Sequence, residues 1–307
     1  MTQEPQTSAA SVQSLAAGTG TPWFRSLFEL KDLVVVALLI VLYRNVAYEL
    51  RAGWTLVDSY YSHGFLIPFI SLFFVWRERK NLGALPRNPS VWGYLWVAGA
   101  AGMLFVGDFL GFGVLTHMSL LPMITGVLLL THGAARTRTI WFPIAFLFFM
   151  IPIPASITQS LALRLKLLAT ESAVQLANLF TFPMVREGSY VHFGDDFLLV
   201  GEVCGGLRSM IALLALGALM AYISKTRWIA RMFLFLIAAP FVAILTNILR
   251  IFSLCVVGYF YGSGVAAGTF HDVSGILIFL TAFICFFTLE GLLRKALPAR
   301  EIREAAP

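Results

Sequence analysis

The sequence has few charged residues and few cysteines. Only 12% of its 307 residues are charged, whereas 59% are hydrophobic, and the mean hydropathy is +0.82. Soluble domains contain about 25% charged residues, so these values exclude an ordinary soluble globule, a disordered chain and a coiled coil. The three cysteines, at positions 204, 255 and 285, are too few for a disulfide framework and lack metal-ligand spacing. We therefore consider each cysteine as a single thiol, and we expect no metal and no organic cofactor.

Apolar segments recur along most of the chain. They lie at about 33–50, 64–76, 91–107, 115–132, 139–153, 208–223, 229–250 and 273–293. A transmembrane helix needs about 20 apolar residues, so we predict an all-α polytopic membrane protein with about eight transmembrane helices. Residues 25–297 form a single multi-span domain in this prediction. Residues 1–24, rich in Ala, Ser, Thr, Gln and Gly, and residues 298–307 are expected to be tails, the first of them disordered.

The basic residues are distributed unevenly between the loops. Fifteen of the 22 Lys and Arg residues lie before the first span, after the last span or in alternate loops. Basic loops stay on the cytoplasmic side, so both termini are expected to be cytoplasmic. This distribution explains the net charge of +6 without a nucleic-acid partner.

One outer interval, 154–206, is too long for a simple turn. Its first part, 156–181, carries polar residues on one helical face, which predicts an amphipathic helix at the outer interface. Two short apolar runs then flank Gly194, Asp195 and Asp196. This pattern is typical of a small hairpin, which would lead the chain to Cys204 just before the sixth span.

Cys204 is the first candidate for chemistry. Gly205 and Gly206 follow it, and an apolar helix then begins. A thiol at a helix N-terminus is expected to have a lowered pKa, and the two glycine N–H groups are suited to hold an oxyanion. Arg208 lies one helical turn further on, where it can support a thiolate or bind an acidic substrate group. The alternative is a buried structural cysteine beside a Gly-Gly packing site.

Two more candidates are expected at the same membrane face. Residues 229–250 make 22 residues, enough to cross the membrane, so Arg250 should emerge at the outer surface, with Asn247 on the same helical face. His271 precedes the last span. A thiol, a guanidinium and an imidazole are sufficient parts for acyl transfer. Alternatively, Arg250 is an interfacial arginine whose side chain extends to the membrane surface.

Two further residues are candidates for supporting groups. In addition, two alternatives to an enzyme are consistent with the sequence. Glu202 could orient an arginine, and His63, at the outer start of the second span, either binds substrate or caps its helix. Charges at membrane depth also mark transport pathways, so a transporter or channel is the main alternative to an enzyme. A non-catalytic membrane scaffold is the third reading.

Four segments resemble motifs of the exosortase/archaeosortase family. They are "YYSHGFLIPFISLFFVWRER" (60–79), "REGSYVHF…VGEVCGGLRSM" (186–210), "TNILRI" (246–251) and "FHDVSG" (270–275). They follow the family's order over most of residues 55–295, and the cysteine segment is the most specific. One departure is Gly205, where many members carry serine.

The resemblance implies a function. Members are membrane cysteine proteases or transpeptidases that process exported proteins at a C-terminal sorting signal, which consists of a short motif such as Pro-Glu-Pro, one apolar helix and a basic tail. Bacterial members are linked to exopolysaccharide systems in Gram-negative inner membranes, so the resemblance implies an inner-membrane location for this protein. The family's nucleophile then corresponds to Cys204, its arginine to Arg250 and its histidine to His271.

Overall fold

The protein folds mainly into helices, with one small sheet. The computed structural model describes residues 30–56, 59–201, 206–224 and 227–296. The predicted tails at 1–24 and 298–307 lie outside these residues. The N-terminal half contains α3 (Leu30–Leu42), α4 (Arg44–Thr55), η1 (Ser62–Phe65), α5 (Leu66–Arg77), α6 (Arg79–Ala84), α7 (Trp92–Leu110), α8 (Gly113–Met118), α9 (Leu120–Thr131), α10 (Ala134–Thr139), α11 (Trp141–Phe146) and η2 (Leu147–Met150).

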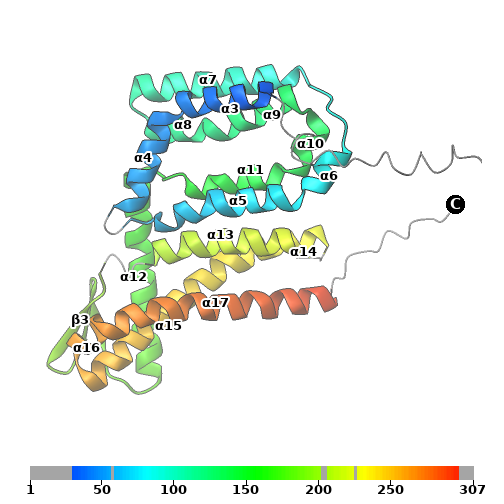
Figure 1. Cartoon of the computed structure of the whole chain (residues 1–307). Helices are drawn as coiled ribbons and strands as arrows, with labels where there is room; N and C mark the ends of the chain where they lie inside the picture. The colour runs from blue at the N-terminus through cyan, green and yellow to red at the C-terminus, as the bar shows by residue number, and fades with distance from the viewer. Residues whose placement is uncertain (1–29, 57–58, 202–205, 225–226, 297–307) are drawn as a thin grey trace, which may run out of the picture.

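The C-terminal half begins with a helix and a sheet, and long helices follow. Its elements are α12 (Ala155–Leu179), β1 (Val185–Glu187), β2 (Tyr190–Phe193), β3 (Asp196–Leu199), α13 (Leu207–Ile223), α14 (Trp228–Phe233), the π-helical turn η4 (Leu234–Ala238), α15 (Ala239–Tyr261), α16 (Ser263–Ala267) and α17 (Thr269–Ala296). In Figure 1, α5, α11, α13 and α17 run side by side, and α12 crosses them at one end.

Each of the eight predicted apolar runs consists mostly of helical residues. Four helices are long and apolar enough to cross a membrane, namely Trp92–Leu110, Gly113–Thr131, Trp228–Tyr261 and Val273–Ala296. Two bent pairs raise this number to as many as 6 if each counts as one span, and Ser62–Arg77 and Leu207–Ile223 are shorter apolar helices. An apolar, mostly helical membrane protein is therefore confirmed, while the count of eight spans stays a prediction.

The predicted outer insert forms a folded cap at one end of the helices. The amphipathic helix expected at 156–181 is α12, which is bent by 80° from the preceding helix. The expected hairpin is β2–β3, paired antiparallel with Phe193 opposite Asp196. A strand that was not predicted, β1, adds to its other side to give the order β1-β2-β3. The cap comprises α12, these strands, α16 and the last turns of α15, which pack around one apolar core (Ala169, Ala173, Val174, Ala177, Met184, Val191, Phe193, Leu198, Val200, Ile251, Leu254, Cys255 and Ala266).

Polar contacts hold the parts of the cap together. The Arg186 Nε atom lies 2.6 Å from a Glu171 carboxylate oxygen, which ties β1 to α12. Asp196 accepts hydrogen bonds from the backbone N–H of Ser263 at 2.8 Å and from its hydroxyl at 2.9 Å, which ties β3 to the start of α16. These contacts hold the sheet against α12 and α16.

One sequence-based boundary is wrong. The loop before the last span was expected to start after Arg250, but α15 continues for eleven residues to Tyr261. The helix ends there because Gly262 has a φ of +84°, a conformation that glycine adopts without steric cost. Arg250 therefore lies inside a helix, between turns that belong to the spans and turns that belong to the cap.

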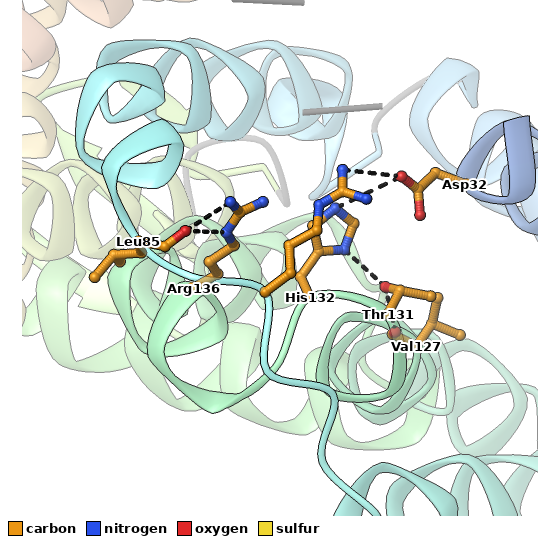
Figure 2. Close-up of polar contacts among 7 residues, drawn as sticks. Asp32, Leu85, Val127, Thr131, His132 and Arg136 are labelled. Carbon is orange, nitrogen blue, oxygen red and sulfur yellow. Dashed lines mark hydrogen bonds and ion pairs between the residues drawn. The ribbon is translucent and has the colours of Figure 1, made fainter. Parts of the chain in front are cut away.

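The opposite end of the molecule holds a cluster of buried charges (Figure 2). Asp32 of α3 is only 4% exposed and lies 3.3 Å from Arg87, in the loop before α7. His132 follows α9 and lies 3.9 Å from the same carboxylate. The guanidinium of Arg136, on α10, donates twice to the carbonyl of Leu85. These contacts fix α3 and α10 against the loop at 85–87, at the end where α6, α10 and α14 gather (Figure 1).

Candidate active site

Arg250 lies between two apolar cores. Its neighbour Ile251 belongs to the core of the cap. On the other side, a core between α13, α15 and α17 contains Val242, Ala243 and Ile278. The Arg250 side chain is 9% exposed. A buried arginine is costly unless polar groups surround it. The partners of Arg250 therefore show which chemical groups meet at this junction between the two cores.

The partners of Arg250 lie on the first turns of α17. Its Nη2 atom lies 3.2 Å from Nε2 of His271 and donates to the His271 carbonyl at 3.4 Å. Its Nε atom donates to the hydroxyl of Ser274 at 3.0 Å. The structure thus brings together the guanidinium and the imidazole that sequence analysis placed at one face. His271 lies within the first turn of α17, rather than in the loop before the last span.

The contact between the two side chains indicates which ring nitrogen of His271 accepts a hydrogen bond. A guanidinium nitrogen only donates hydrogen bonds, so Nε2 of His271 must accept. A neutral imidazole that accepts at Nε2 carries its proton on Nδ1, a tautomer assigned here from the partner. The pair therefore places a fixed positive charge beside an imidazole nitrogen that has a lone pair.

Gly206 connects the start of α13 to the helix that carries Arg250. It caps α13 with a φ of +77° and a ψ of −7°. A Cβ atom at this position would lie 2.4 Å from both Cγ and Nδ2 of Asn247. Asn247 is 4% exposed and lies one helical turn before Arg250. Only glycine therefore allows the start of α13 to approach α15 this closely.

Three of the predicted site residues, Glu202, Cys204 and Gly205, lie outside the described residues. Cys204 precedes the N-cap residue Gly206 by two positions, so the helix start expected after the cysteine is present. Arg208 is the second residue of α13 and is half-buried. The roles predicted for these four residues stay predictions.

His63 lies in another part of the structure and has no hydrogen bond to the Arg250–His271 pair. It is in η1, where its ring stacks on Tyr61 with centroids 6.1 Å apart. Both ring nitrogens are buried, and the backbone of Phe149 lies within hydrogen-bonding reach of the ring. Tyr61 packs with Leu207, the first residue of α13. The Tyr-Ser-His-Gly segment therefore supports the start of α13 through packing.

A cleft opens beside Arg250. It has a volume of about 220 Å³ and lies between α15 and α17, with Thr246, Ser253, Phe270 and Thr281 among its lining residues. Arg250 and Ser274 also line it. Within the ranges that the structure describes, no group of three or more His, Cys, Asp or Glu side chains is arranged to hold a metal ion. The polar groups of this junction are thus a guanidinium, an imidazole, an amide and hydroxyls.

Sequence analysis did not single out Ser274. Serine in the first turns of a helix is common, because its hydroxyl can bond to nearby backbone groups, and its spacing of three from His271 gives no further signal. Its contact with Arg250 joins residues 24 positions apart, on two different helices. Only the packing of α15 against α17 reveals this contact.

Comparison with known proteins identifies the family. Residues 53–288 match the family model described as transmembrane exosortase (Exosortase_EpsH). No curated protein and no solved structure matches the chain. The matched range covers more than three quarters of the sequence and includes η1, the whole cap, α13, α15 and the first turns of α17. The chain therefore belongs to the transmembrane exosortase family.

Proposed function

We propose that this protein is a membrane cysteine peptidase or transpeptidase that cleaves a C-terminal sorting signal from exported proteins. The observation that carries the proposal is the contact between Arg250 and His271, at 3.2 Å, beside the helix that follows Cys204. Family membership supports the class of reaction. The proposed site faces the periplasm, in the inner membrane, with both termini in the cytoplasm.

The proposed reaction begins at Cys204. Its thiol gives a proton to Nε2 of His271, which leaves Nη2 of Arg250 free to turn to the substrate, and the sulfur attacks the carbonyl carbon of the scissile peptide bond. The carbonyl oxygen becomes an oxyanion, which Arg250 and the backbone N–H groups of Gly205 and Gly206 stabilise. His271 then returns the proton to the departing nitrogen, and the C–N bond breaks. The products of this step are a thioester on Cys204 and a released C-terminal segment.

A second nucleophile completes the proposed cycle. An amine, a hydroxyl group or water attacks the thioester and releases the new C-terminus. His271 takes the proton of this nucleophile and returns it to the sulfur. Arg208 is proposed to bind an acidic side chain of the recognition motif, and the apolar helix of the substrate is proposed to dock from the membrane. The supporting arrangement is the position of Arg208 on the first turn of α13.

The test is a processing assay in cells. A secreted reporter ending in Pro-Glu-Pro, one apolar helix and a basic tail is co-expressed with the full-length protein, and its C-terminus is determined by mass spectrometry. Cys204→Ala and Cys204→Ser should abolish processing at unchanged expression. Cys255→Ala and Cys285→Ala serve as controls and should process normally. Undiminished cleavage by the Cys204 variants would refute the nucleophile, and Cys204-independent solute flux in proteoliposomes would favour a transporter.

A further inference from the structure

Ser274 is a buried hydroxyl that contacts both Arg250 and His271. Its side chain is 4% exposed. The hydroxyl donates to the backbone carbonyl of His271 at 2.7 Å and accepts from Nε of Arg250 at 3.0 Å. Ser274 thus connects the turn that carries the imidazole to the guanidinium on the neighbouring helix.

The two hydrogen bonds give the hydroxyl a fixed direction. A serine hydroxyl has one proton and two lone pairs. Because the proton is used in the bond to the His271 carbonyl, a lone pair is left to face the Nε–H of Arg250. The position of the acceptor is therefore set by the backbone of α17 and not by free rotation of the hydroxyl.

A fixed acceptor at Nε determines where the other guanidinium nitrogens lie. The guanidinium group is planar, and its N–H bonds form a rigid fork. With Nε held by Ser274, Nη2 is directed at His271, where it meets both the ring at 3.2 Å and the carbonyl at 3.4 Å. Removing the hydroxyl would leave a buried N–H without this acceptor and would free the plane to rotate.

We propose that Ser274 is a positioning residue that orients the guanidinium of Arg250 relative to His271. This inference rests on the function proposed above, in which Arg250 stabilises the oxyanion. Ser274 acts through Arg250 and does not itself touch the reacting atoms. Its contribution is to hold a donor in the geometry that the transition state needs, because small errors in such geometry reduce the rate steeply.

A second hydroxyl on the same helix, that of Thr288, serves as a control because its hydrogen bond has only a local role. Thr288 donates to the carbonyl of Ile284, one turn earlier in α17, at 2.8 Å, and it is exposed. Its hydrogen bond serves the helix alone. Comparison of Thr288 with Ser274 thus separates a helix-stabilising bond from a bond that positions Arg250.

The experiment uses the full-length protein in proteoliposomes with the Pro-Glu-Pro reporter. Ser274→Ala should lower kcat by roughly tenfold or more, because a hydrogen bond to a charged group is lost, while KM changes by less than about twofold. Ser274→Thr keeps the hydroxyl, and the adjoining cleft of about 220 Å³ has room for the added methyl group. It should restore kcat to within about threefold of the wild type. Thr288→Ala should behave as the wild type.

The outcomes separate this inference from the proposed function. If Cys204→Ala stops cleavage but Ser274→Ala cleaves as fast as Thr288→Ala, the positioning role is wrong and the proposed function stands. Failure of Ser274→Thr to restore kcat, in correctly folded protein, would also overturn the positioning role. If Cys204→Ala cleaves normally, the proposed function itself is refuted.

Discussion

Gly206 offers a sharp test of how the site is assembled. In Gly206→Ala, the new Cβ would lie 2.4 Å from Cγ of Asn247, whereas ordinary van der Waals contacts begin at 3.4 Å. The Asn247 amide must therefore move by about 1 Å, within a buried face of α15. A φ of +77° also costs an L-residue about 1–2 kcal/mol, and overpacking adds about 1–3 kcal/mol.

Gly206→Ala should lower both the stability and the activity of the protein. A loss of about 2–5 kcal/mol should lower the melting temperature of the detergent-solubilised protein by several degrees. A displacement of about 1 Å, one turn before Arg250, should reduce the rate of reporter cleavage by up to about a hundredfold. Thermal unfolding and initial cleavage rates in proteoliposomes measure the two effects separately.

Gly201→Ala is the matched control. A Cβ at Gly201 meets no atom within 4 Å, so its stability should stay within about 0.5 kcal/mol of the wild type. If Gly206→Ala matched Gly201→Ala in both melting temperature and rate, the close approach of α13 to Asn247 would not be needed. The argument that glycine is required at the start of α13 would then be wrong.

Three further predictions concern separate parts of the molecule. Arg250→Ala should remove about 2.7–4 kcal/mol of transition-state stabilisation and slow reporter cleavage by roughly 10²–10³-fold; a wild-type rate would contradict its role. Asp32→Asn should destabilise the protein by about 1–3 kcal/mol, because the half-buried Arg87 loses the ion pair that it makes with the buried Asp32 carboxylate, and an unchanged unfolding midpoint in denaturant would contradict this. The backbone N–H of Ser263 and two further hydrogen bonds hold the pKa of Asp196 below its ordinary 3.8. The ionised carboxylate therefore stabilises the contact of the sheet with α16 fully above pH 3.8, and this stabilisation is lost as the pH falls through the lowered pKa. Backbone hydrogen exchange of β3 should accelerate in this acidic range. The acceleration should be smaller in Asp196→Asn, in which the contact of β3 with α16 is already weakened at neutral pH.

The helices and the hairpin could be predicted from local patterns. Long apolar runs identify helices that meet lipid or a core, whatever their neighbours are. The Gly194-Asp195-Asp196 turn between apolar runs identifies β2 and β3. The strand β1 gave a weaker signal, because its three residues, Val185–Glu187, show no alternation long enough to detect.

The end of α15 was predicted wrongly for a physical reason. Hydropathy alone suggests that a span stops at a charged residue, so Arg250 was taken as its end. The next turns are apolar as well, but they pack into the cap core through Ile251, Leu254 and Cys255 and not against lipid. Because hydropathy cannot distinguish a protein core from a membrane, the boundary between spans and cap could not be found from the sequence.

The candidate site was predicted in part. Residue chemistry and alternating basic loops placed Arg250 and His271 at one face, and the two side chains do meet. The additional partner, Ser274, could not be predicted, since its contact with Arg250 depends on the rotation of α17 about its own axis. The close packing of Gly206 on Asn247 likewise depends on the distance between two helices.

Trapping of the intermediate tests the central claim most directly. Full-length protein in proteoliposomes is mixed with the Pro-Glu-Pro reporter, quenched in acid and digested, and the peptide masses are measured. The account predicts a hydroxylamine-sensitive thioester between Cys204 and the reporter's new C-terminus, and no such adduct in Cys204→Ala. An adduct on Cys255 or Cys285 instead, or reporter cleavage that continues in Cys204→Ala without any thioester, would contradict it.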